Sequence, residues 1–173
     1  MQPHQMRVTN QPMVNEAKPI HCTLARFLEV SVLKHSRFPG APGNRSFYHK
    51  LISATSTPIN LIVLSMLYMT KLRTVNSPLL DEYPGQLVYT ACLQLAFGIA
   101  DDVPYATRSW STLSGYSLKQ INSVIRSILH ALDYRLEVTS SAFAKYKSCM
   151  LRLISPSYPI FTNNFPRTFQ TIP

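Results

Sequence analysis

Residues 85–98, GQLVYTACLQLAFG, decide the fold of this chain. Small or slim side chains recur every three or four positions along this stretch, which is the spacing of one face of an α-helix. The stripe consists of Val88, Ala91, Cys92, Leu95, Ala96 and Ile99. Because small residues let neighbouring helices approach closely, we expect this helix to lie at the centre of a helical bundle.

Helical patterns precede the central segment. Residues 22–34 and 46–54 show helical spacing of their apolar side chains. Residues 58–73 are apolar nearly all round, which is typical of a buried helix. We expect Thr57 to cap this helix and Pro58 to occupy its first position, where the missing N–H group costs nothing.

Three further helices follow the central segment. Residues 108–114 form a short helical pattern, and Gly115 is expected to end it in a left-handed conformation. The sequence SLKQ at Ser117–Gln120 is a capping box that opens a strongly periodic helix over 117–132. Residues 140–154 give the last helix.

These patterns predict an all-α fold of seven helices joined by loops, among them 35–44 and 76–84. We divide the chain into a flexible N-terminal arm (1–21), one helical domain (22–154) and a Pro-rich disordered tail (155–173). The longest apolar block, residues 58–69, is well short of the roughly 20 residues of a membrane span, so no membrane partner is expected.

The central helix is followed by two adjacent carboxylates, Asp101 and Asp102. A catalytic pair would need two different environments around a shared cleft. Short acidic side chains in a loop more often bond free backbone amides and cap the next turn. We therefore interpret this pair as a joint between helices, although the sequence leaves catalysis as an alternative.

Other signatures of chemistry are absent from the sequence. The five glycines are too dispersed for a phosphate-binding loop, and neither HExxH nor GxSxG occurs. Cys22, Cys92 and Cys149 lack the spacing of a zinc site and are consistent with free thiols in a reducing compartment. We expect no catalytic residue, no metal and no cofactor, and hence a protein that is not an enzyme.

The net charge of +9 is unevenly distributed. Residues 1–75 hold nine Lys/Arg against two acids, and residues 76–173 hold eight against six. Such a bias is compatible with nucleic acid, an anionic membrane or an acidic protein partner. Because the basic residues are scattered singly, a solvated surface is the simpler interpretation, and nucleic acid ranks behind a protein partner.

The run LAFGIADDVPYATRSWSTLSGYSLKQINSVIRSILHALDYRLEV (Leu95–Val138) resembles the third to fifth helices of a cyclin box, in particular that of fungal Pcl-type cyclins. Phe47–Arg73 resembles the first two box helices, and the resemblance covers residues 24–153. The matching pieces are Asp101-Asp102, Tyr105, Arg108-Ser109-Trp110, Leu113-Ser114-Gly115, Ser117-Leu118, Ile121-Asn122 and Ala131–Leu136.

The resemblance implies a single five-helix cyclin box with a flanking N-terminal helix and a flanking C-terminal helix. It also implies a cell-cycle regulatory subunit, in the nucleus or cytoplasm, that forms a heterodimer with a Pho-type cyclin-dependent protein kinase. Such a subunit pushes the kinase C-helix inward and shifts the kinase toward its active state. By the resemblance, the kinase interface comprises Leu95, Gly98, Ile99, Ile125 and Leu129.

Two positions depart from the family. This chain has Gly98 where the family usually carries a lysine, and Ile125 where it usually carries a glutamate. The lysine and the glutamate of the family support each other. Because both are absent here, neither charge is left without its partner. Gly98 is also a candidate C-cap that would end the central helix early.

Three functions stay open at this point. Leu95, Ile99 and Leu129 could bind a kinase through apolar contact and modulate its activity. The same fold could instead serve as an adaptor that binds without activating. A nucleic-acid-binding module on a cyclin-like fold is the third possibility.

Overall fold

The structure, a computed structural model, describes residues 17–36, 44–100 and 106–154. Within these ranges the chain is all-helical, with eight helices and no strand. They are α1 (Ala17–His35), α2 (Arg45–Ala54), α3 (Ile59–Thr74), α4 (Leu79–Glu82), α5 (Gly85–Ala100), α6 (Thr107–Ser114), α7 (Leu118–Ala131) and α8 (Ser140–Ile154). None of the helices described combines the length and apolar character that a membrane span requires.

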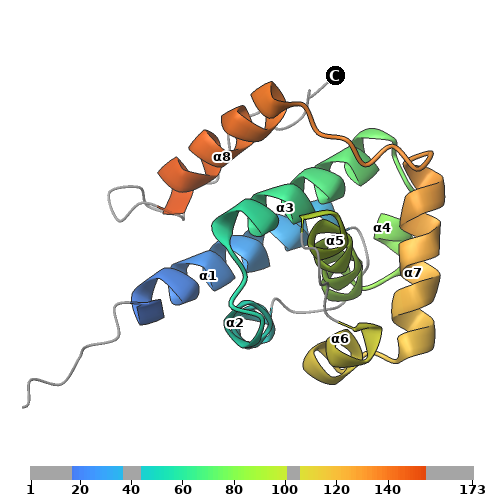
Figure 1. Ribbon diagram of the computed structural model, residues 1–173, viewed down its shortest axis with the longest axis horizontal. Coiled ribbons are helices and arrows are strands. Elements are labelled where there is room, and N and C mark those ends of the chain that lie inside the picture. Colours follow the sequence, from blue (N-terminus) through green and yellow to red (C-terminus); the bar gives the residue numbers. More distant parts are fainter. Residues whose placement is uncertain (1–16, 37–43, 101–105, 155–173) are drawn as a thin grey trace, which may run out of the picture.

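The central position of α5 is confirmed. This helix packs against α1, α3, α4, α6 and α7, and Figure 1 shows it nearly end-on with α3, α4, α6 and α7 around it. Ten of its sixteen residues are buried, which a helix in contact with a single neighbour could not achieve. Its stripe reaches the surface at the C-terminal end, where Leu95 is half-buried and Ile99 is exposed.

The α5 helix begins against α1 because Gly85 has no side chain. A Cβ atom at Gly85 would lie 2.8 Å from Cβ of Ser36 and 2.9 Å from Cγ1 of Val32. Both distances are shorter than a carbon–carbon contact permits. The two helices could not approach this closely with a larger residue at position 85.

The α3 helix forms the second layer of the core. It packs along α5 on one side, and α1 and α8 also contact it. Figure 1 shows α8 lying alongside α3, on the side away from α6. Ten of the sixteen residues of α3 are buried, as its apolar sequence predicts.

The sequence signals around α7 are confirmed. Gly115 ends α6 in the left-handed conformation, with φ of 77°. The backbone N–H of Gln120 donates to Ser117 Oγ over 3.2 Å, and the N–H of Ser117 donates to Gln120 Oε1 over 2.9 Å. These two bonds form the predicted capping box and satisfy two amides that have no partner within the helix.

Three expectations at helix starts are wrong. Thr57 does not cap α3, because its hydroxyl bonds the Thr55 hydroxyl and Pro58 itself occupies the cap position.

The α1 helix begins at Ala17 rather than at residue 22, since Pro19 falls in the first turn, where proline is tolerated. The expected loop 76–84 contains the one-turn helix α4, whose first amide donates to Ser77 Oγ.

Gly98 does not end α5, which continues to Ala100. Asp101 and Asp102 lie outside the described residues, as do residues 1–16 and 155–173. The interpretation of the acidic pair as a joint therefore stays a prediction, and so does that of the arm and the tail.

Candidate functional site

The five residues expected at an interface come from two helices that pack against each other. Leu95, Gly98 and Ile99 lie on the last two turns of α5, whereas Ile125 and Leu129 lie one turn apart on α7. Leu95 and Ile125 are half-buried and pack against the core. Ile99 is 56 % exposed, although it lies on a helix that is otherwise mostly buried.

Ile99 borders a shallow groove of about 570 Å³. The other walls come from α3, from the segment that joins α7 to α8, and from the start of α8. The lining is mostly apolar and consists of Leu64, Tyr68, Ile99, Tyr134, Leu136, Glu137, Val138, Ser140 and Phe143. Of the five expected residues, only Ile99 lines this groove; Leu95, Gly98, Ile125 and Leu129 do not.

The joining segment, residues 133–138, adopts an unusual backbone where it meets the groove. Asp133 and Tyr134 both have positive φ, of 52° and 58°. This left-handed conformation costs a non-glycine residue roughly 1–2 kcal/mol, so the surrounding structure must hold it. The Tyr134 side chain is 70 % exposed beside the groove.

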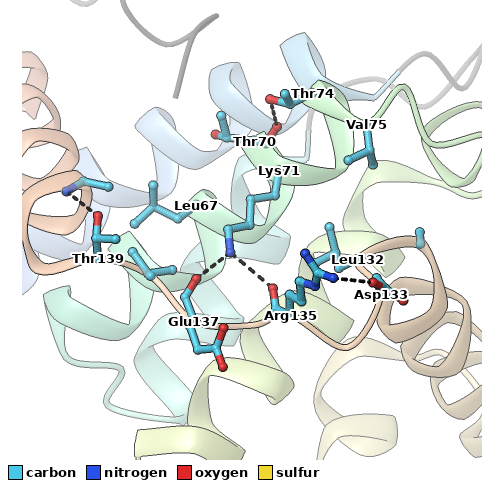
Figure 2. Close-up of a pocket in the computed structure, with 13 residues that line it drawn as sticks. Leu67, Thr70, Lys71, Thr74, Val75, Leu132, Asp133, Arg135, Glu137 and Thr139 are labelled. Carbon is cyan, nitrogen blue, oxygen red and sulfur yellow. Dashed lines mark hydrogen bonds and ion pairs between the residues drawn. The ribbon is translucent and has the colours of Figure 1, made fainter. Parts of the chain in front are cut away.

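A second hollow lies on the opposite side of the same segment. It has a volume of about 400 Å³, and Figure 2 shows Lys71 of α3 reaching from its wall to the segment. Lys71 Nζ donates to the carbonyl oxygen of Arg135 over 3.2 Å and to that of Glu137 over 2.6 Å. Desolvation lowers the pKa of Lys71, and the Glu137 carboxylate opposes this shift.

The charged side chains near these hollows are mostly solvated. Arg135 and Asp133 form an ion pair at 3.2 Å, but both side chains are about 80 % exposed and the pair contributes little to stability. Lys71 differs from them because it is half-buried and binds backbone rather than a carboxylate.

Burial makes the potential nucleophiles of the core unreactive. The Cys92 thiol is fully buried, and desolvation raises its pKa. Tyr68 is buried at the groove, where desolvation raises its pKa to about 12. In the part of the chain that the structure describes, no three His, Cys, Asp or Glu side chains are grouped so that they could hold a metal ion.

Tyr134, Leu136 and Val138 also line the groove beside Ile99, although sequence patterns did not predict them as interface residues. They fall in a stretch that breaks the helical pattern, where no interface residue was expected. Their signal is the alternation of apolar and polar residues from Leu132 to Val138, which is typical of an extended segment with one buried face.

No family model matches the chain, and no curated protein or solved structure matches it. The helices of the described residues place the protein in the all-α class. An apolar groove lies at one end of its central helix.

Proposed function

We propose that this chain is a cyclin-like regulatory subunit that binds a cyclin-dependent protein kinase and modulates its activity. In this proposal α2, α3, α5, α6 and α7 form the five-helix box around α5, with α1 and α8 as flanking helices. The resemblance of Leu95–Val138 to Pcl-type cyclins names a Pho-type kinase as the partner.

The observation that carries the proposal is the groove beside Ile99. Apolar side chains that lie together at the surface are typical of protein interfaces, where a partner removes them from water. Ile99 and Tyr134 are 56 % and 70 % exposed, and both line the same groove. The positive φ at Tyr134 fits this proposal, because residues in sparsely populated backbone conformations cluster at functional sites.

The groove suits an apolar face of a helix, which is the part of a kinase that a cyclin engages. Contacts made only with the inward position of the kinase C-helix would favour that position and so raise the active fraction. The chain contributes no reacting group to this event. It acts by differential binding of two kinase conformations.

The direct experiment is co-purification of the full chain with a Pho-type kinase, followed by a kinase assay with and without the chain. A stable one-to-one complex with increased phosphorylation supports the proposal. The absence of a complex at micromolar concentrations of both proteins contradicts it.

An adaptor that binds without activating is the second candidate, and Gly98 with Ile125 favours it. The family carries a lysine and a glutamate at these positions, and those side chains bond the kinase backbone. In this chain Gly98 is exposed with open space around it, and Ile125 packs half-buried against the core. An apolar interface of this kind can hold a kinase without fixing its C-helix.

The double variant Gly98→Lys with Ile125→Glu separates the two candidates. A lysine fits at position 98, because a Cβ atom there meets nothing within 4 Å. If the missing pair limits activation, the double variant stimulates the kinase more than the natural chain does. The charge-matched control is Ala54→Lys on α2 with Asn122→Glu on α7, two exposed positions that do not line the groove. Equal stimulation by the natural chain and the double variant would show that the pair is not the reason.

A further inference from the structure

The segment 133–138 has few backbone bonds of its own, although it forms one wall of the groove. Its first amides bond back to the end of α7: Tyr134 N–H donates to Leu129 O over 2.8 Å and Arg135 N–H to Leu132 O over 2.9 Å. Leu136 N–H closes a tight turn on Tyr134 O over 3.2 Å. The segment is neither helix nor strand, so no ladder of hydrogen bonds fixes its course.

Its far end is fixed by α8. The Thr139 hydroxyl accepts from the Ala142 amide over 3.2 Å, and the Thr139 carbonyl accepts from the Phe143 amide over 2.9 Å. Between these two anchored ends, Lys71 supplies bonds from outside the segment (Figure 2). It reaches the segment from the last turn of α3, a helix with ten buried residues that can serve as a rigid base.

The two carbonyls that Lys71 binds each follow a groove-lining residue. Arg135 comes directly after Tyr134, and Glu137 directly after Leu136. Tyr134 and Leu136 line the groove, Arg135 lines the hollow that holds the lysine, and Glu137 and Val138 line both. Lys71 therefore holds the backbone of the segment from the hollow, while the side chains of Tyr134 and Leu136 line the groove.

We propose that Lys71 is a positioning residue: its ammonium group binds two carbonyls of the segment 133–138 and thereby holds Tyr134 and Leu136 in the shape that receives the partner. A lysine ammonium has three donors and no acceptor, so it can bind both carbonyls at once. Charge-assisted bonds of this kind are stronger than neutral ones and can hold the left-handed turn at Asp133 and Tyr134. This inference rests on the proposed function where it concerns a partner, but not where it concerns the segment itself.

The chain offers a matched control on the same turn of α3. Arg73 is also a cation there, and its Nη1 donates to a backbone carbonyl, that of Lys34 on α1, over 3.3 Å. Lys71→Met and Arg73→Met remove one positive charge each from neighbouring positions. Only Lys71→Met removes the bonds to the segment, while keeping a side chain of similar length. Lys71→Arg retains the charge and the donors.

The first measurement needs no partner. Amide hydrogen exchange of Tyr134, Arg135 and Leu136 is followed by NMR in the full-length chain. We expect Lys71→Met to speed their exchange about tenfold or more, because the segment opens locally without unfolding the bundle. Arg73→Met should leave these rates unchanged, and Lys71→Arg should restore most of the protection. Equal rates in the two methionine variants, or global unfolding of Lys71→Met, would overturn the proposal.

The second measurement is a double-mutant cycle with the purified Pho-type kinase as the probe. We expect Tyr134→Ala to weaken binding about tenfold in the natural chain, as truncation of a central aromatic does. In a Lys71→Met background the same truncation should cost less than about threefold, because the tyrosine is no longer held in place. A merely structural lysine would leave the effect of Tyr134→Ala unchanged, and that result would contradict the proposal. If the chain binds no kinase, the proposed function fails while the exchange measurement still decides the role of Lys71.

Discussion

At the scale of single residues, His35 is a buried titratable group that links two helices. Its Nδ1 lies 2.7 Å from the Ser31 carbonyl oxygen and must donate, because a carbonyl only accepts. Its Nε2 lies 3.3 Å from the Thr70 hydroxyl on α3. Desolvation lowers the pKa of His35; the bond to Ser31 opposes this shift, and the charges of Arg73 and Lys34 add to it.

Stability should therefore fall in mild acid. A histidine whose pKa is lowered on folding binds more protons in the unfolded chain, so protonation favours unfolding. The contribution of neutral His35 is fully present above the unfolded pKa, about 6.5, and is lost as the pH falls from there toward the lower folded value. Thermal unfolding measured from pH 7.5 down to pH 5 should show this decline.

His35→Gln is the variant that tests this origin, because glutamine can still donate to Ser31 but does not titrate. The decline between pH 6.5 and 5 should be smaller in this variant. His130→Gln, an exposed position on the last turn of α7, is the control and should retain the natural pH dependence. If stability declines equally in His35→Gln and the natural chain, groups other than His35 cause the acid sensitivity.

Substitution of two exposed glycines by alanine should change the free energy of unfolding in opposite directions. Gly98 lies inside α5, where a Cβ atom meets nothing within 4 Å, so Gly98→Ala should raise the free energy of unfolding by roughly 0.5–1 kcal/mol. Gly115 also has open space but a φ of 77°, so Gly115→Ala should lower it by roughly 1–2 kcal/mol. Urea denaturation of both variants measures the difference. Destabilisation by Gly98→Ala would mean that α5 ends before residue 98.

At the scale of elements, α7 depends on its capping box. Ser117→Ala removes the acceptor of the Gln120 amide and should lower the free energy of unfolding by about 1 kcal/mol. Ser127→Ala, in the middle of the same helix, removes a hydroxyl without touching a cap and should change stability little, since alanine favours helix. The midpoints of urea denaturation of Ser117→Ala and Ser127→Ala measure this difference. Equal losses in both variants would argue against the box as the source of stability.

Local signals explain why most elements could be predicted. Gly115 and Ser117–Gln120 specify a helix end and a helix start through bonds within a few residues, and both predictions are confirmed. The one-turn helix α4 could not be predicted, because four residues are too few to show a period. The start of α1 at Ala17 was missed because Pro19 resembles a loop signal, although a first turn accepts proline.

At the scale of the whole molecule, the bundle around α5 could be predicted but the groove could not. The stripe of small residues from Val88 to Ala96 indicates a central helix in any all-α arrangement. The groove instead depends on where the segment 133–138 lies relative to α3 and α8, which is a matter of tertiary structure. Ile99 is the one expected interface residue that lines the groove. Tyr134 could be recognised only in the structure, from its exposed side chain and its positive φ.

The central claim is that the groove beside Ile99 receives a kinase. The measurement that tests it most directly is calorimetric titration of the purified kinase with the natural chain, Ile99→Asp and Leu118→Asp. Leu118 is 39 % exposed at the first residue of α7, about 20 Å along that helix from its end at the segment 133–138. Each variant replaces one exposed aliphatic side chain by one carboxylate.

We predict that Ile99→Asp weakens binding of the kinase at least about tenfold, because a carboxylate would lose its hydration in an apolar contact. Leu118→Asp should bind the kinase like the natural chain. Equal affinities for all three proteins, or no binding by the natural chain, would contradict the account.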